Sequence, residues 1–326
     1  MKKVLIAILL LGLLPHASAD YIHWVDFRLS APVLRSALEL DMASQGGEQP
    51  LDWIDILALA AAWRGGTGVT VADTQRAAQA LRGDTPPERL PGMAGRYFSY
   101  YREAYGAALG GLAGHFAIRR TDPQTGEAEW IPAYGLKAFS PIAAGYPWSH
   151  YPDFGAQRGY GYARPHLGND ILGALGTPIC AVEGGTVEAL GWNRYGGWRI
   201  GIRSDDRKRY YYYAHLRKDT PYAEGLAVGQ RVQAGDVIGF MGRTGYSTQE
   251  NVNNIETVHL HFGLQLIFDE SQKECDSEIW IDAYPIIELL ASHCSSVARD
   301  PQTGRWERLY PYCDLDAEPL RSAAAR

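Results

Sequence analysis

The spacing of hydrophobic residues divides the chain into a helical part and a β-rich part. Between residues 29 and 114, hydrophobic side chains recur at helical spacing, which is typical of helices that bury one face. The segment from Leu51 to Trp63 is hydrophobic almost all round, so we predict a central helix there, ended by Gly65-Gly66. The other predicted helices are Val33 to Leu40, with Ser30 as a candidate cap, then Thr74 to Leu81 and Tyr97 to Leu112.

A turn sequence marks the change from helices to strands. Asp122-Pro123-Gln124-Thr125-Gly126 lies between two short β-prone stretches, 116–119 and 129–131, and this arrangement predicts a β-hairpin. The same five residues recur at 300–304. Because the flanking residues do not match over any fixed period, we interpret the recurrence as repeated turn chemistry and not as a structural repeat.

Short β-prone segments bounded by Gly, Asn or Asp continue to residue 267 and predict a mainly antiparallel sheet. They are 177–182, 186–190, 198–202, 209–215, 237–241 and 258–266. Hydrophobic residues between 279 and 291 predict a helix that closes this part of the chain. The predicted fold class is therefore α+β with several domains: a helical region at 20–114, a β-hairpin linker at 115–145, a β-rich domain at 146–291 and a C-terminal extension at 292–326.

The first residues add a targeting segment to this picture. Lys2 and Lys3 precede an apolar run from Val4 to Leu14, and Ala17-Ser18-Ala19 follows. This order predicts a secretory signal peptide at 1–19, with export to the cell envelope, the periplasm or the extracellular space. The apolar run is short for a bilayer span, and an uncleaved anchor is the alternative. No later segment is apolar enough to span, so no stable membrane span is expected after cleavage.

Composition and charge exclude some partners. The 326 residues are 46% hydrophobic and 21% charged, which is ordinary for a soluble globular protein. The formal net charge is -6, and the chain has no run of Lys or Arg longer than three residues. Nothing therefore favours binding to a nucleic-acid backbone, and nucleic acid is not an expected partner. The sequence leaves the oligomeric state open.

The four cysteines are consistent with an exported protein. Cys180 lies in an apolar strand-like stretch and is interpreted as a buried thiol. Cys275, Cys294 and Cys313 lie toward the C-terminus, and any two of them could pair in an oxidising compartment. The chain contains no Cys-x-x-Cys, so a thiolate zinc site is not expected.

Two histidines and an earlier His/Asp pair predict a metal site. In the strand predicted at 257–262, alternation places His259 and His261 on one face. His166 and Asp170 lie four positions apart in a Pro- and Gly-containing loop that turns into a strand. Imidazole nitrogen and carboxylate oxygen are common ligands of Zn²⁺. One further histidine from the strand gives three protein ligands and leaves the fourth position for water, as in catalytic zinc sites.

A fifth candidate ends a tyrosine-rich strand at 210–216. Alternation predicts that His215 shares a face with Tyr211 and Tyr213. Taken alone, His215 fits a strand-end histidine that hydrogen-bonds to its neighbours. Taken together with the other four residues, it becomes a candidate for the site.

These motifs resemble, in their order along the chain, the lysostaphin/LytM-type zinc endopeptidases, which cut bacterial cell-wall peptides. The resemblance covers about residues 160 to 268, and several separated motifs in the right order are more specific than any one of them. The connecting motifs that carry it are Val182-Glu183-Gly184-Gly185-Thr186-Val187, Tyr213-Ala214-His215-Leu216, the Gly-rich stretch from Val228 to Gly239, and Gly242-Arg243-Thr244-Gly245-Tyr246-Ser247.

The resemblance implies a role for each site residue. His166, Asp170 and His261 would bind one Zn²⁺ per chain, and His215 and His259 would be catalytic residues beside the water without binding the metal. A zinc-activated water would then hydrolyse a peptide bond of bacterial peptidoglycan, the implied partner. The β-rich domain at 146–291 would be the zinc peptidase domain. A His-Glu-x-x-His helix is absent, so no glutamate base on such a helix is expected.

One departure from the family concerns substrate recognition. The polar stretch 248–258 is longer than the usual family pattern, and we expect this insertion to form one wall of the cleft. Among the many nearby aromatic residues, Trp192, Tyr195 and Tyr246 lie in Gly-rich loops and are the candidate substrate residues.

Two alternatives belong to other function classes. A non-catalytic cell-wall or assembly scaffold would retain the peptidase fold without turnover, but the presence of all five site residues favours the enzyme. A lipoyl- or biotinyl-carrier hairpin would resemble the segment from Gly229 to Gly242. Such a carrier needs a lysine at its turn, and no lysine occurs between Lys218 and Lys273.

Overall fold

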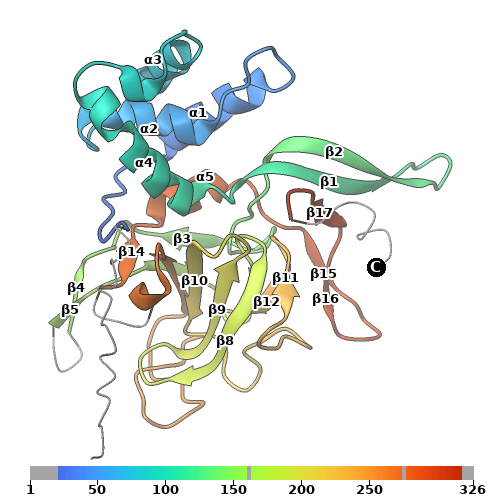
Figure 1. Cartoon of the computed structure of the whole chain (residues 1–326). Helices are drawn as coiled ribbons and strands as arrows, with labels where there is room; N and C mark the ends of the chain where they lie inside the picture. Colours follow the sequence, from blue (N-terminus) through green and yellow to red (C-terminus); the bar gives the residue numbers. More distant parts are fainter. Residues whose placement is uncertain (1–20, 160–162, 274–276, 318–326) are drawn as a thin grey trace, which may run out of the picture.

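The computed structural model describes residues 21–159, 163–273 and 277–317. The predicted signal peptide and Cys275 lie outside these ranges. Figure 1 shows a group of helices at the top, a β-rich body below it and a long hairpin that projects to one side. The predicted fold class, an N-terminal helical region followed by a mainly antiparallel β domain, is confirmed.

The helical region is built around α2 (Trp53–Arg64), as the all-round hydrophobic pattern predicts. Nine of its residues are buried, the Asp52 side chain caps its start, and Gly65 ends it in the left-handed conformation with φ +64°. Ser30 occupies the cap position of the first helix, but its side chain makes no capping hydrogen bond. The helices around α2 are α1 (Ala31–Ser44), α3 (Val71–Leu81) and α4 (Met93–Leu109), with a short 3₁₀ turn η1 (Pro87–Arg89).

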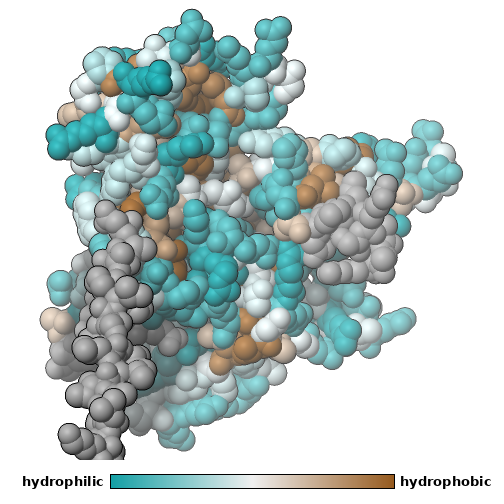
Figure 2. Space-filling model, in the orientation of Figure 1, coloured by the Kyte–Doolittle hydropathy of each residue, from teal (hydrophilic) through white to brown (hydrophobic). Residues whose placement is uncertain are grey.

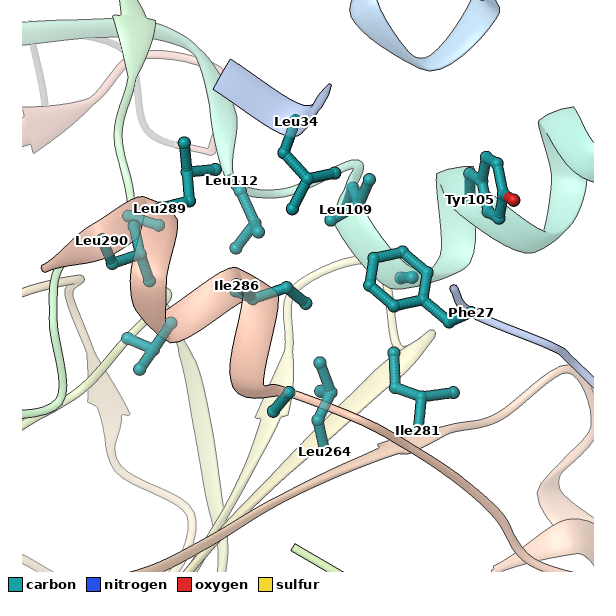
Figure 3. Packing of buried hydrophobic residues seen from close by; sticks show 14 of the residues in the cluster. Phe27, Leu34, Tyr105, Leu109, Leu112, Leu264, Ile281, Ile286, Leu289 and Leu290 are labelled. Atoms are coloured by element: carbon teal, nitrogen blue, oxygen red, sulfur yellow. The ribbon is translucent and has the colours of Figure 1, made fainter. Parts of the chain in front are cut away.

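The helices share one hydrophobic core with the β-rich body. Figure 3 shows Leu34 of α1 and Leu109 of α4 close to Ile286 and Leu289 of α5 (Tyr284–Leu290). Leu264, which belongs to the strand that carries His259 and His261, also lies in this cluster. The helical region therefore packs on the face of the sheet opposite to the two histidines.

A buried arginine completes this junction. Arg209 is 1% exposed, and its Nη1 donates hydrogen bonds to the Ala107 and Gly106 carbonyl oxygens at the end of α4, at 2.7 and 3.2 Å. The last carbonyls of a helix lack the hydrogen-bond partners of its interior, and Arg209 supplies one to the Ala107 carbonyl, whereas the Gly106 carbonyl also accepts from the Gly110 N–H at 2.9 Å. Arg209 also forms an ion pair with the buried Glu183, with Nε 2.8 Å from Oε2. The charge is thus compensated where the two regions meet.

The largest sheet has eight strands, all in antiparallel pairs, and carries the candidate site. Its order is β11-β8-β9-β10-β13-β6-β3, with β14 beside β13. The strands are β3 (Trp148–His150), β6 (Asn169–Gly173), β8 (Gly185–Asn193), β9 (Gly197–Ser204), β10 (Arg209–Ala214), β11 (Arg231–Val232), β13 (His259–Leu266) and β14 (Ile279–Ile281).

The remaining strands form small sheets at the edges, and two of these have the same turn. The Asp122 carboxylate accepts from the backbone N–H of Gln124 and Thr125, at 2.7 and 3.2 Å. Asp300 does the same with the two residues at the corresponding positions of its own turn. The predicted repeated turn chemistry is therefore confirmed. The small sheets are β1 (Ala113–Thr121), β2 (Ala128–Leu136) and β17 (Tyr312–Asp314); β15 (Val297–Arg299) and β16 (Trp306–Arg308); β4 (Gln157–Gly159) and β5 (Ala163–Pro165); β7 (Pro178–Cys180) and β12 (Val237–Phe240).

The prediction of one closing helix over 279–291 is wrong in its first part. Residues 279–281 form β14, which pairs with β13 in the register Leu264↔Ile281, and the helix begins only at Tyr284. A hydrophobic run of this length fits either a helix or a buried strand by spacing alone. The structure has a strand here because residues 264–266 of β13 need a pairing partner. Pairing with 279–281 satisfies backbone N–H and C=O groups that would otherwise be buried without a hydrogen bond.

Two further features concern the burial of the Cys180 thiol and the polarity of the surface. The Cys180 thiol is buried as predicted, and burial raises its pKa above the ordinary value. Figure 2 shows a mainly hydrophilic surface on the helices and on the β1–β2 hairpin, with small hydrophobic patches between them. Among the helices of the described ranges, none has both the length and the apolar character that a membrane crossing needs.

Candidate metal centre

Strand register brings the first two candidate ligands together. β6 and β13 pair in the register His261↔Asp170, so these two side chains are direct cross-strand neighbours on the same face. Asp170 Oδ1 lies 3.1 Å from His261 Nδ1. His166 lies in the turn between β5 and β6, and its Nε2 is 3.0 Å from Asp170 Oδ1 and 2.8 Å from His261 Nδ1. Three potential ligand atoms thus converge on one point.

The geometry of this triangle fits a zinc ion. Ligand atoms at about 2.0–2.1 Å from Zn²⁺ in a tetrahedral shell lie about 3.3 Å from one another. The three distances between His166 Nε2, Asp170 Oδ1 and His261 Nδ1, 2.8, 3.0 and 3.1 Å, are close to that value. Two imidazole nitrogens and one carboxylate oxygen are also a donor set that Zn²⁺ accepts. In the part of the chain that the structure describes, these residues form the His/Cys/Asp/Glu group arranged to hold a metal ion.

Asp153 and Arg158, which the sequence motifs do not indicate, contact the candidate ligands His166 and Asp170. Asp153 lies next to His166 Nδ1, with its backbone oxygen at 3.1 Å and Oδ2 at 3.2 Å. Arg158 Nη2 donates to Asp153 Oδ2 at 2.6 Å and to Asp170 Oδ2 at 3.0 Å. A partner on the outer nitrogen or oxygen of a metal ligand fixes its orientation and its protonation state. We infer that Asp153 and Arg158 orient His166 and Asp170.

The carboxylates make this cluster favourable for a positive charge. Burial raises the pKa of Asp170, but hydrogen bonds with His166 and His261 outweigh burial and hold that pKa well below its usual range. Burial lowers the pKa of His166, but its contacts with Asp153 and Asp170 outweigh burial and raise that pKa to about 9. Burial, the largest effect, lowers the pKa of His261. Imidazole binds a metal in its neutral form, so a metal ion would take the place of the proton that the raised pKa keeps on His166 at pH 7.

His215 and His259 lie beside the triangle and outside it. His259 Nε2 is 3.7 Å from Asp170 Oδ1, and the His215 and His259 rings are 4.8 Å apart. Nδ1 of His215 lies 2.9 Å from the Thr244 carbonyl oxygen, and Nδ1 of His259 lies 2.9 Å from the Thr257 carbonyl oxygen. A carbonyl can only accept, so Nδ1 carries a proton in both rings, and the lone pair of the neutral ring is on Nε2.

The prediction that His215 shares a face with Tyr211 and Tyr213 is wrong. Tyr211 and Tyr213 are buried against Phe262 on the core side of the sheet, whereas His215 lines the cleft. Strand alternation ends at Ala214, and His215 adopts the left-handed conformation with φ +62°. This conformation is uncommon for a residue with a Cβ and turns the ring toward His259. Burial, followed by the nearby His259 and His261, lowers the pKa of His215 well below its ordinary value, so its ring is neutral at pH 7.

Gly168 provides the space that the His261 ring occupies. A Cβ at residue 168 would lie 2.6 Å from both Cε1 and Nε2 of His261 and 2.8 Å from the Phe262 carbonyl oxygen. Contacts that short force the ring or the backbone to move. The lack of a side chain at Gly168 therefore lets the His261 ring reach His166 and Asp170.

We expect Gly168→Ala to weaken zinc binding by at least about tenfold, the scale seen when the support of a metal ligand is lost. The added methyl group displaces the His261 ring from the triangle. Competition with a chromogenic chelator measures the zinc dissociation constant. Gly159→Ala is the matched control, because nothing lies within 4 Å of a Cβ at that position. Equal zinc affinities of the two variants would show that His261 does not depend on the space at Gly168.

The five residues line a cleft of about 900 Å³. The polar insertion supplies Asn254, Ile255, Glu256 and Thr257 to its lining, as expected for one wall. Of the three candidate substrate residues, Tyr195 and Tyr246 line the cleft. The structure places the third, Trp192, against Trp198, with ring centroids 5.7 Å apart, and its indole donates to the Ser247 carbonyl oxygen at 3.2 Å.

Comparisons with known proteins agree with this geometry. Residues 164–274 match the description of peptidase family M23. An L-Ala–D-Glu endopeptidase of Bacillus subtilis (strain 168) is 41% identical over 130 residues, which are 40% of this chain and 38% of that protein. Lysostaphin of Staphylococcus simulans is 36% identical over 115 residues, which are 32% of this chain and 21% of that protein. The chain thus spans well under two thirds of either relative.

A solved structure resembles a larger part of the chain. It is the crystal structure of a protein from Ruminococcus gnavus assigned as a LytM glycyl-glycine endopeptidase, with 26% sequence identity and a TM-score of 0.48. The match covers 82% of this chain and 91% of the other.

Proposed function

We propose that residues 164–274, which match peptidase family M23, are the catalytic domain of an exported zinc endopeptidase. The proposed enzyme hydrolyses peptide bonds in bacterial peptidoglycan. The observation that carries the proposal is the arrangement in the cleft. Three ligand atoms lie 2.8–3.1 Å apart, and two further histidines face them. The names of the two relatives, an L-Ala–D-Glu endopeptidase and lysostaphin, support a cell-wall peptide as the substrate.

In this proposal His166, Asp170 and His261 hold the metal. Zn²⁺, when bound, acts as a Lewis acid that polarises a carbonyl and lowers the pKa of water. Asp170 has a second role, because its Oδ2 receives the Arg158 hydrogen bond at 3.0 Å while Oδ1 faces the two histidines. The ligand set is thereby fixed before a substrate enters, so little reorganisation is needed.

His215 and His259 supply the proton transfers. Each ring has its Nδ1 proton engaged with a backbone carbonyl, so Nε2 is free to take a proton from the attacking water or to pass one to the leaving amine. His259 Nε2 is the nearer of these groups to the ligand carboxylate, at 3.7 Å from Asp170 Oδ1. His215 is 5% exposed, which shields its proton from bulk solvent.

The proposal is tested with the chain from Asp20 onward, loaded with zinc and incubated with defined muropeptides. We expect about one zinc per chain, hydrolysis products by mass spectrometry, loss of activity with a chelator and recovery with added zinc. The measurement separates the enzyme from the scaffold alternative, since a scaffold can bind zinc without turnover. A zinc-loaded protein that leaves both cross-linked and linear muropeptides intact would be evidence for the scaffold.

A further inference from the structure

Two guanidinium groups on the cleft lining have no carboxylate partner in the described part of the chain. Arg164 of β5 and Arg199 of β9 both line the cleft. Across residues 21–159, 163–273 and 277–317, neither forms an ion pair with Asp or Glu, and Nε of each is buried without a hydrogen-bond partner. A buried donor that stays unsatisfied costs free energy, so each of these two groups calls for an explanation.

The other charges of the cleft are accounted for. Arg158 is bonded to Asp153 and Asp170, and Lys273 forms an ion pair with Glu188 outside the cleft. Glu256 is exposed on the insertion wall, where its carboxylate faces water. Glu278, also on the lining, accepts a hydrogen bond from the Trp280 indole at 2.7 Å. Of the arginines and lysines on the lining, Arg164 and Arg199 are therefore the two without a carboxylate partner among the described residues.

Both guanidinium groups line the same cleft as Tyr212. Arg199 stands two positions before Gly201, the register partner of Tyr212, so Arg199 and Tyr212 lie on the same face of the sheet. The Tyr212 ring centroid is in turn 6.0 Å from that of His261. Arg164 Nη2 donates to the Tyr246 hydroxyl at 2.9 Å, and the Tyr246 ring lies 5.8 Å from the His215 ring.

Aromatic rings hold Arg164 without neutralising it. Its guanidinium carbon lies 5.0 Å from the centroid of the Tyr195 ring and 5.8 Å from that of Tyr246. Such contacts orient the planar group and leave its charge available. A fixed guanidinium matches a carboxylate, because parallel N–H donors meet the two oxygens.

We propose that Arg164 and Arg199 form a subsite for a carboxylate of the substrate, so that the cleft selects peptides with a free acidic group near the scissile bond over neutral peptides. This inference rests on the proposed endopeptidase function and adds a substrate class to it. Both guanidinium groups are half-buried and have no Asp or Glu partner among the described residues, so the carboxylate would neutralise them. A peptide with a carboxamide at the same place carries no charge and would bring N–H donors against them.

The test compares two muropeptides that differ only in one group, a free carboxylate or a carboxamide on the acidic residue. We expect kcat/KM of the zinc-loaded wild-type protein to be at least about tenfold higher for the carboxylate peptide, the scale of a charge-assisted hydrogen bond. Arg199→Gln and Arg164→Gln should bring this ratio close to one, mainly through KM, with unchanged zinc content. Arg76→Gln is the control, because Arg76 is exposed on α3 and lies over Trp63.

Two results would overturn the inference and are distinct from a failure of the proposed function. One is a wild-type ratio near one; the other is an Arg199→Gln or Arg164→Gln variant that retains the wild-type ratio. If the wild-type protein cleaves neither peptide, the endopeptidase proposal fails, and calorimetric affinities of the same pair decide on the subsite. Tighter binding of the carboxylate peptide than of the carboxamide peptide, lost in both arginine variants, would support the subsite. Equal affinities of the wild-type protein for the two peptides would refute it.

Discussion

Replacing His261 by Ala is expected to abolish zinc binding and peptide hydrolysis together. His261 Nδ1 is one corner of the triangle with His166 Nε2 and Asp170 Oδ1, and two remaining ligands do not hold Zn²⁺ in a closed tetrahedral shell. Loss of the metal also removes the Lewis acid, so the residual rate should fall to the background of the assay. Metal analysis after gel filtration and product detection by mass spectrometry measure the two effects.

The matched control for His261→Ala is His23→Ala. His23 is exposed, and its ring contacts that of Tyr21, with centroids 4.4 Å apart. His23→Ala should keep both zinc and activity. A His261→Ala protein that is folded by circular dichroism and still hydrolyses muropeptides would remove His261 from the active site. In that case the triangle would be a network of hydrogen bonds without a metal.

Replacing His259 by Ala is expected to have the opposite pattern, with zinc retained and turnover lost. His259 Nε2 is 3.7 Å from Asp170 Oδ1, whereas the ligand nitrogens of His166 and His261 are at 3.0 and 3.1 Å. The ring therefore lies beside the metal position and is not needed to complete the triangle. Removal of a general acid or base costs about 10²- to 10⁴-fold, and we expect kcat to fall by that factor.

The same two assays decide this second prediction. Zinc content near one per chain with strongly reduced kcat supports the division between ligand and proton-transfer residue. Loss of zinc from a folded His259→Ala protein contradicts the division and makes His259 a ligand. A His259→Ala protein with full zinc content and full activity also contradicts the division, since His259 would then have no part in the reaction.

The helices and hairpins were predictable because their signals are local. Helical spacing, the Gly65-Gly66 stop and the Asp-Pro-Gln-Thr-Gly turns each act within a few residues of the backbone they shape. Residues 279–281 show the limit of this reasoning. Their hydrophobic run fits either a helix or a strand, and only the neighbouring edge of β13 selects the strand.

Some features of the candidate site were also predictable from the sequence, and others were not. The faces of His259 and His261 follow from strand alternation, and the resemblance to the LytM-type family names the five residues. The orientation of His215 does not follow, because its backbone leaves the strand at φ +62°. Asp153 and Arg158 were not predicted either, since neither stands in a motif, and only folding brings them to His166 and Asp170.

Local spacing thus determines which elements form and which side chains share a face, because those properties depend on the period of the backbone. The tertiary structure decides the distances between groups that are far apart in sequence. The register of β6 on β13 sets Asp170 opposite His261. Folding brings Arg164 of β5 and Arg199 of β9 to one cleft, where neither has a carboxylate partner among the described residues. Charge pairing and ligand geometry depend on ångström distances in space, and no local period encodes them.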